Sequence, residues 1–188
     1  MFFNALARIG VAQTSQMSVK FVLLILLRKR EFRLARWGLV DWEEQTLTLP
    51  SSVMKMSRPH RVYLSRQAKD ILIALNNVYA HSEYLHPGHF GPRLPLSNAA
   101  LNAAIRSELK QLAEEGVEFE PFSVHDLRRT ASTLLQEAGY NSDRIEKCLA
   151  HELRGVRVVY NKAECAEQRA SMLQDWADMV DSWIEKFK

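Results

Sequence analysis

The amino-acid sequence predicts a mainly α-helical protein with one small antiparallel β-sheet, an α+β fold. Apolar residues recur at helical spacing in several long segments, whereas only two short segments have the β-prone character of strands. The chain has 188 residues and a mass of 21.6 kDa. Because a chain of this length commonly forms one hydrophobic core, we expect residues 1–188 to make up a single domain.

The first half of the chain is expected to form a helix and then the sheet. Residues 17–36 combine good helix formers with an apolar run, which predicts one helix that starts near Ser18 and is buried until its arginines begin. Residues 45–50 and 61–64 are short β-prone runs separated by the turn-forming segment 57–59. These two runs predict the antiparallel sheet.

The rest of the chain is expected to be helical except for one loop. Residues 81–97 contain three prolines and two glycines, a composition that predicts a loop. Gly139 is well placed to cap the C-terminus of a helix. The predicted helices cover residues 66–80, 98–114, 124–138, 142–151 and 163–186.

The last predicted helix carries one apolar stripe, which includes Met172, Trp176, Val180 and Trp183. Such a stripe usually packs on the core of its own domain. A second interpretation is that the helix docks on a neighbouring subunit. The sequence leaves both interpretations open.

Composition excludes several classes of protein. The longest apolar run, residues 21–27, has seven residues, whereas a bilayer span needs about 20. No secretory signal is recognisable, so we expect a cytoplasmic protein without a membrane helix. Cys148 and Cys165 are too few for a disulfide framework and are expected to be reduced.

The basic residues are unevenly distributed along a chain whose net charge is only +3. Residues 28–66 contain nine lysines and arginines and four acids. A basic block of this kind favours a surface that faces nucleic acid. The alternative is an ordinary solvated surface with ion pairs.

A few polar residues suggest a phosphate site. Arg28 and Glu31 are spaced i, i+3, so the carboxylate can hold the guanidinium, and His125 and Arg128 have the same spacing. Arginines and histidines that converge on one point would form a donor-rich cavity suited to a phosphate oxyanion. A tyrosine such as Tyr160 could add a nucleophile that forms a covalent intermediate.

Taken together, these motifs resemble the catalytic domain of the tyrosine recombinases, the phage integrase family. The similar segments are residues 27–37, 54–65, 125–133, 149–151, 160–163 and the acidic, Trp-containing segment 172–178. One departure is the pair Leu26 and Leu27, where the family usually has small or polar residues before the first arginine. The family's N-terminal core-binding and arm-binding domains have no counterpart in residues 1–188.

The resemblance implies a role for each matching residue. Tyr160 is expected to be the nucleophile, Lys55 the acid for the leaving 5′-oxygen, and His125 the residue that assists proton removal. Arg28 and Arg128 are expected to bind the phosphate oxygens, with Glu31 supporting Arg28 and His151 hydrogen-bonding the phosphate. We expect DNA contacts from Arg58, Arg61 and Arg129, and neither a metal nor a cofactor.

The implied function is site-specific DNA recombination by a prophage or genomic-island integrase, through a 3′-phosphotyrosine intermediate. The implied partners are double-stranded DNA at attachment sites and further copies of the chain, which form a tetramer on DNA through the C-terminal helix. One alternative is a non-catalytic, DNA-binding remnant of an integrase. Another is a metal site formed by His81, His86 and His89, whose spacing could supply three nitrogen ligands.

Overall fold

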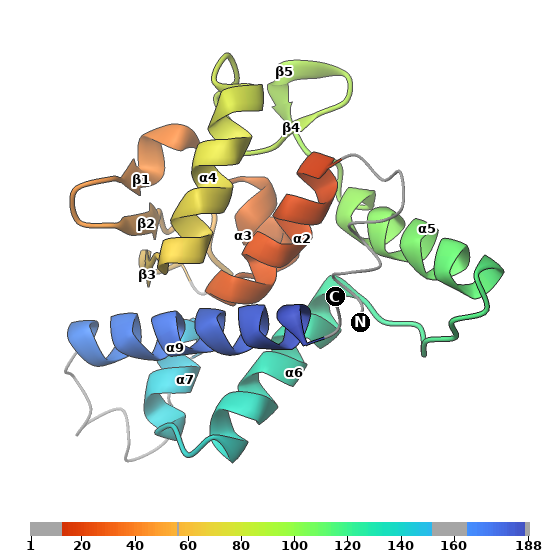
Figure 1. The fold of residues 1–188 in the computed structure, drawn as a ribbon. Coiled ribbons are helices and arrows are strands. Elements are labelled where there is room, and N and C mark those ends of the chain that lie inside the picture. Colours follow the sequence, from red (N-terminus) through yellow and green to blue (C-terminus); the bar gives the residue numbers. More distant parts are fainter. Residues whose placement is uncertain (1–12, 56, 152–164, 187–188) are drawn as a thin grey trace.

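The fold is mainly α-helical with two small antiparallel sheets, as shown by a computed structural model that describes residues 13–55, 57–151 and 165–186 (Figure 1). This agrees with the predicted fold class. The elements are, in order, α2 (Gln13–Ile25), α3 (Lys29–Arg33), the 3₁₀-helix η1 (Trp37–Leu39), β1 (Val40–Asp41), β2 (Thr46–Leu49), β3 (His60–Tyr63), α4 (Arg66–Tyr79), β4 (Pro87–Gly88), β5 (Gly91–Pro95), α5 (Ala100–Glu114), α6 (Val124–Glu137), α7 (Ser142–Cys148) and α9 (Ala166–Glu185).

Helix α2 lies at the centre of the domain. It packs against α4, α5, α6 and α9, and its second half is buried on all sides. Phe21, Val22 and Leu24 are each at most 1% exposed. A helix that is apolar all round must be covered on all sides, which explains why the longest apolar run of the chain lies here. None of the described helices is both long and apolar enough to cross a bilayer.

The prediction of one continuous helix over residues 17–36 is wrong. Helix α2 ends at Ile25, Leu26 adopts a left-handed conformation with φ of 57°, and a separate helix α3 begins at Lys29. The break is stabilised at the start of α3. There the Glu31 carboxylate accepts a hydrogen bond from the backbone N–H of Arg28, the residue that caps α3. Arg28 therefore lies between a sharp turn and the start of α3 and not inside one long helix.

The predicted strands form the main sheet, together with one strand that the sequence did not indicate. Strand β2 lies between β1 and β3, and all pairs are antiparallel, with Leu49 opposite His60. Leu47 and Leu49 are fully buried beneath the sheet. The loop between β2 and β3 carries Lys55 away from this core.

The predicted loop 81–97 contains a short hairpin of β4 and β5. Prolines cannot donate ladder hydrogen bonds, so its three prolines argued against strands. The hairpin is instead closed by side chains: the Ser82 hydroxyl donates to the Pro92 carbonyl at 2.7 Å. A Cβ on Gly88 would lie 2.8 Å from the Pro95 carbonyl oxygen, so only glycine fits there.

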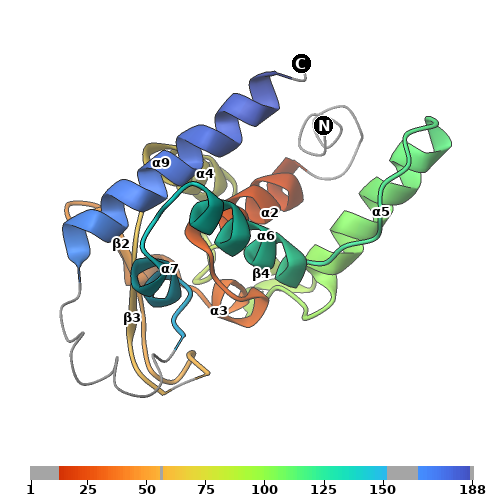
Figure 2. The same cartoon turned by 90° about the horizontal axis from the view of Figure 1, so that it is seen from below.

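The second half of the chain is close to prediction. Helices α4, α5 and α6 match their predicted bounds to within two residues. Gly139 follows the end of α6 with φ of 86°, as expected for a C-terminal cap. Helix α7 ends at Cys148, three residues earlier than predicted, because Ala150 turns into the left-handed region with φ of 47°. Helix α5 projects away from the other helices (Figure 2).

The stripe of α9 packs on the domain's own core over most of its length. Met172, Trp176 and Val180 are buried, and the Trp176 indole N–H donates to the Leu23 carbonyl at 3.0 Å. Trp183, near the end of the helix, is only half-buried. The core-packing interpretation is therefore confirmed for the first three residues.

Candidate active site

A pocket of about 340 Å³ lies where four segments of the chain meet. Its lining comes from the start of α3, the loop between β2 and β3, the first turn of α5 and the start of α6. Among the described lining side chains, five are lysines or arginines and none is a carboxylate. The lining residues are Leu27, Arg28, Lys29, Arg30, Lys55, Asn102, Ser123, Val124, His125 and Arg128. The structure thus brings together four of the six residues predicted to be catalytic.

Arg28 is fixed at the edge of the pocket by a buried carboxylate. Glu31 is 1% exposed, and one of its oxygens accepts Arg28 Nη1 at 2.7 Å. Its other oxygen accepts the Arg28 backbone N–H, also at 2.7 Å. The expected contact between Arg28 and Glu31 is therefore present, and it positions the guanidinium through two separate hydrogen bonds.

Arg128 lies deeper and is 4% exposed. Its guanidinium donates to the carbonyls of Leu26 and Leu149. Leu26 is the residue at which the first helix breaks, so its carbonyl is available for a side-chain donor. Arg128 thereby joins α6 both to the turn before Arg28 and to the segment after α7.

The two arginines create a site that favours an anion. Burial, and next the nearby positive charge of Arg28, lower the pKa of Arg128 to about 10. Because both guanidiniums remain charged at neutral pH, an anion between them would relieve their repulsion. A phosphate has several acceptor oxygens, and the planar fork of an arginine guanidinium can donate two hydrogen bonds to them.

His151 lies beside Arg128 and is oriented by a residue that the sequence did not single out. Its Nε2 is 3.3 Å from Arg128 Nη2, and its Nδ1 is 2.6 Å from the carboxylate of Glu146. Glu146 precedes His151 by five residues on α7, a spacing without a recognisable pattern. The carboxylate fixes the imidazole ring and leaves Nε2 on the side of Arg128.

His125 and Lys55 are exposed, unlike Arg28 and Arg128. His125 is the second residue of α6, whose start is held by Asp126. The Asp126 carboxylate accepts both the backbone N–H and the hydroxyl of Ser123, at 2.9 and 2.7 Å, and these hydrogen bonds lower its pKa. Lys55 lies on a loop that Arg30 braces by donating to the Val53 carbonyl at 2.9 Å.

The remaining predicted residues are Tyr160, Arg58, Arg61 and Arg129. Tyr160 falls outside the residues that the structure describes. Arg58, Arg61 and Arg129 are exposed and do not line the pocket. Arg129 makes only a loose ion pair with Asp126, at 3.7 Å.

Sequence analysis missed four lining residues with polar side chains, namely Lys29, Arg30, Asn102 and Ser123. Lys29 and Arg30 belong to the Arg-Lys-Arg run that contains Arg28, so the charge of that run was a usable signal. Asn102 lies on the first turn of an unremarkable helix and gave no signal. Only the packing of α5 against the start of α6 brings it to the pocket.

The three histidines of the alternative metal site are not arranged as ligands in the described structure. His86 is buried, with Nδ1 2.6 Å from the Ser18 hydroxyl, and its ring stacks on Tyr79 at 5.1 Å. Within residues 13–55, 57–151 and 165–186, no group of three or more potential ligands among His, Cys, Asp and Glu comes together.

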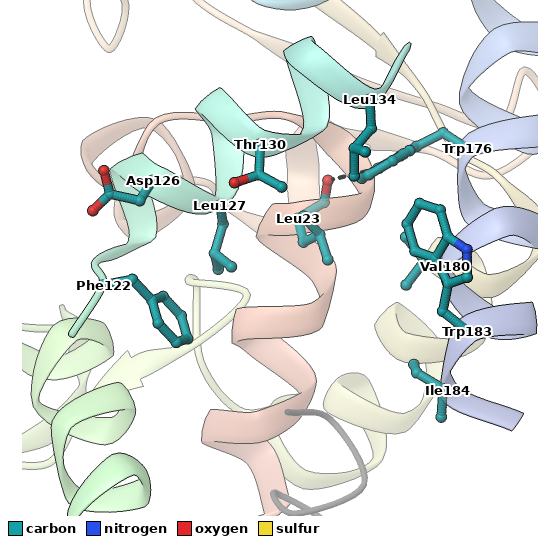
Figure 3. A pocket seen from close by; sticks show the side chains of 10 residues that line it. All are labelled: Leu23, Phe122, Asp126, Leu127, Thr130, Leu134, Trp176, Val180, Trp183 and Ile184. Atoms are coloured by element: carbon teal, nitrogen blue, oxygen red, sulfur yellow. Dashed lines mark hydrogen bonds between the residues drawn. The ribbon is translucent and has the colours of Figure 1, made fainter. Parts of the chain in front are cut away.

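A second pocket of about 410 Å³ lies between α2, α6 and the end of α9 (Figure 3). It is mainly apolar, and Trp183 and Ile184 of α9 face Leu23, Leu127 and their neighbours across it. Asp126 lies at one end, on the same first turn of α6 as His125. The two pockets are thus separated by the start of α6.

Comparison with solved structures identifies the fold. The integrase from mycobacterium phage Brujita matches with a TM-score of 0.65 and 18% sequence identity, over 91% of this chain and 54% of that one. A lambda integrase dimer bound to a COC′ core site matches with a TM-score of 0.60 and 15% identity, over 82% of this chain and 57% of that one. The fold is that of a tyrosine recombinase catalytic domain.

Sequence comparison identifies the family. The profile of the phage integrase family matches residues 5–167, and the chain belongs to this family. It is 40% identical over 182 residues to the prophage integrase IntZ of Escherichia coli K12. That alignment covers 96% of this chain and 43% of IntZ, so the chain spans less than half the length of this relative.

Proposed function

We propose that this chain is the catalytic part of a site-specific DNA recombinase, a prophage or genomic-island integrase that cleaves and rejoins DNA through a 3′-phosphotyrosine intermediate. The observation that carries the proposal is the pocket in which Arg28, Arg128, Lys55 and His125 converge. Its donor-rich, carboxylate-free lining fits a phosphodiester. Membership of the phage integrase family supports the choice of DNA as the substrate.

In the proposed reaction, the Tyr160 hydroxyl oxygen attacks a DNA phosphorus atom while its proton passes to His125. The bond between phosphorus and the 5′-oxygen breaks, and Lys55 donates a proton to the departing oxygen. One phosphodiester is exchanged for another, so no ATP is needed. Attack by a 5′-hydroxyl of a second strand reverses the step and completes the exchange.

The charge of the five-coordinate transition state is stabilised by preorganised donors. Arg28, fixed by Glu31, and Arg128 donate to the non-bridging oxygens. His151, whose ring is oriented by Glu146, adds a further hydrogen bond to the phosphate. Since these cations neutralise the developing charge, the proposed mechanism uses neither a metal ion nor a cofactor.

The proposed partner is double-stranded DNA at attachment sites, as the DNA-bound lambda integrase dimer supports. Arg58, Arg61 and Arg129 are exposed and available to contact backbone phosphates outside the pocket. Because most of the binding energy then comes from neutralised phosphates, affinity is expected to fall steeply with salt.

The first test is covalent trapping. The full chain at high concentration and low salt, in EDTA, is incubated with a pool of nicked suicide duplexes with randomised sequence around the nick. We expect a denaturation-resistant protein–DNA complex that is absent with Tyr160→Phe, since phenylalanine has no hydroxyl. Sequencing of the trapped strands identifies the preferred site. A complex that persists in Tyr160→Phe would contradict the assignment of the nucleophile.

If no complex forms, the experiment is repeated with the N-terminal region of a similar prophage integrase supplied. Continued absence of a covalent complex, with DNA binding retained, would favour the non-catalytic alternative.

The proposed active assembly is a tetramer on DNA in which the end of α9 contacts a neighbouring subunit. Trp183 and Ile184 support this, since they pack against the edge of the core beside the apolar pocket and are only half-buried there (Figure 3). Large aromatic side chains of this kind often dominate interfaces between subunits.

We expect Trp183→Ser to weaken self-association on DNA by about tenfold or more, because it removes an aromatic anchor. Sedimentation velocity on a fixed duplex measures the assembly. Trp42→Ser is the matched control, because Trp42 is 46% exposed and precedes the distant strand β2. Unchanged assembly in Trp183→Ser, with DNA binding intact, would remove α9 from the proposed interface.

A further inference from the structure

Asn102 is the one uncharged amide side chain in the lining of the basic pocket. It lies on the first turn of α5 and is half-buried. Its Oδ1 accepts the backbone N–H of Val124 at 3.1 Å. Val124 is the first residue of α6 and directly precedes His125, so this bond joins α5 to the helix that carries His125 and Arg128.

The hydrogen bond to Val124 fixes which way round the amide lies. A backbone N–H can only donate, so the atom facing it must be the amide oxygen. The Nδ2 group, with its two hydrogens, then occupies the other position. No described residue accepts a hydrogen bond from Nδ2, and Nδ2 is not a buried atom, so its two hydrogens are open to solvent.

The protein side of the pocket offers little that could accept these hydrogens. Apart from the two apolar residues Leu27 and Val124, the lining consists of cations, His125, and Ser123, whose hydroxyl is engaged with Asp126. A ligand that enters the pocket can therefore accept from Nδ2 in place of water. In a cationic pocket the ligand is an anion, and a phosphate has several oxygens for neutral donors beside the guanidiniums.

On this ground, and resting on the proposed function, we infer that Asn102 is a further phosphate ligand. Its Nδ2 donates to a non-bridging oxygen of a DNA backbone phosphate in the pocket, while its Oδ1 holds the start of α6. A single side chain thus links the position of the bound strand to the position of His125.

The direct test is nuclear magnetic resonance of the full chain carrying Tyr160→Phe, labelled with ¹⁵N. The side-chain NH₂ pair of Asn102 is assigned by its absence in Asn102→Asp. On titration with a short duplex at low salt, we expect this pair to shift together with the backbone amides of Val124 and His125. If the resonances of those backbone amides shift and the side-chain NH₂ resonances of Asn102 do not, the inference is overturned.

Binding measured by fluorescence anisotropy gives a second readout. Asn102→Asp keeps an oxygen facing the Val124 N–H, so the free energy of unfolding should be retained, while the donors are replaced by an acceptor. We expect its affinity for the duplex to fall by about tenfold or more at fixed salt. Ala103→Asp is the matched control. Ala103 is exposed, and this substitution adds the same negative charge one residue away from Asn102.

Equal losses of affinity in Asn102→Asp and Ala103→Asp would show that charge alone acts, and would overturn the inference. Failure of the proposed function has a different signature: no covalent complex through Tyr160, whatever the Asn102 resonances do.

Discussion

Replacement of Arg128 by lysine is expected to slow formation of the covalent protein–DNA complex by about 10²- to 10³-fold. Lysine keeps the positive charge but has one nitrogen in place of a planar fork. It cannot donate to the Leu26 and Leu149 carbonyls and still reach a phosphate oxygen. The rate is measured with saturating suicide duplex, so that weaker binding does not contribute.

The same substitution is expected to lower the free energy of unfolding. The Leu26 and Leu149 carbonyls lose a donor in a site where Arg128 is 4% exposed, and an unsatisfied buried polar group costs about 1–3 kcal/mol. Urea unfolding measures this loss, and the rate is then compared at a temperature where the variant is folded. Arg129→Lys controls for stability, since its side chain is 74% exposed on the same helix. A folded Arg128→Lys with a rate within threefold of the parent would refute the role of Arg128.

The local parts of the site could be predicted from the sequence because they depend on short spacings. Arg28 with Glu31, and His125 with Arg128, are three residues apart, and helix geometry alone brings such pairs together. The order of the motifs further identified the family. In the same way, the apolar run before Arg28 predicted a buried helix, because a helix that is apolar on all sides has to be covered on all sides.

The features of the fold and the site that the sequence did not predict depend on contacts between different segments of the chain. The left-handed turn at Leu26 cannot be read from a leucine, which normally favours a helix; it is stabilised by Glu31 and by Arg128 from another helix. Asn102 reaches the pocket only because α5 packs beside the start of α6. Glu146 orients His151, a residue that lies beyond the end of the helix that carries Glu146. Each of these needs the fold before it can be recognised.

Acidification from pH 7 to pH 4 is expected to destabilise the domain through two buried histidines. Burial lowers the pKa of His86 from 6.5 to about 4. Burial, and next the charge of Arg169, lower the pKa of His60 to about 4 as well. His86 is 7% exposed, and its described hydrogen-bonding neighbours, Ser18 and Tyr79, are uncharged. No carboxylate among these neighbours would stabilise an imidazolium.

Between pH 6.5 and 4 the unfolded chain binds protons at these two positions that the folded chain does not. Stability from each neutral histidine is therefore complete above pH 6.5 and is lost as the pH falls toward 4, by about 3 kcal/mol per group. Other titrating groups also act in this range, so the comparison is with variants. We expect His86→Gln to reduce the loss measured by urea unfolding at pH 7 and pH 4 by about 3 kcal/mol. His89→Gln is the control for a substitution in the same hairpin, because His89 is exposed. The same pH dependence in the parent and in His86→Gln would show that protonation of the buried His86 ring does not cause the loss of stability at low pH.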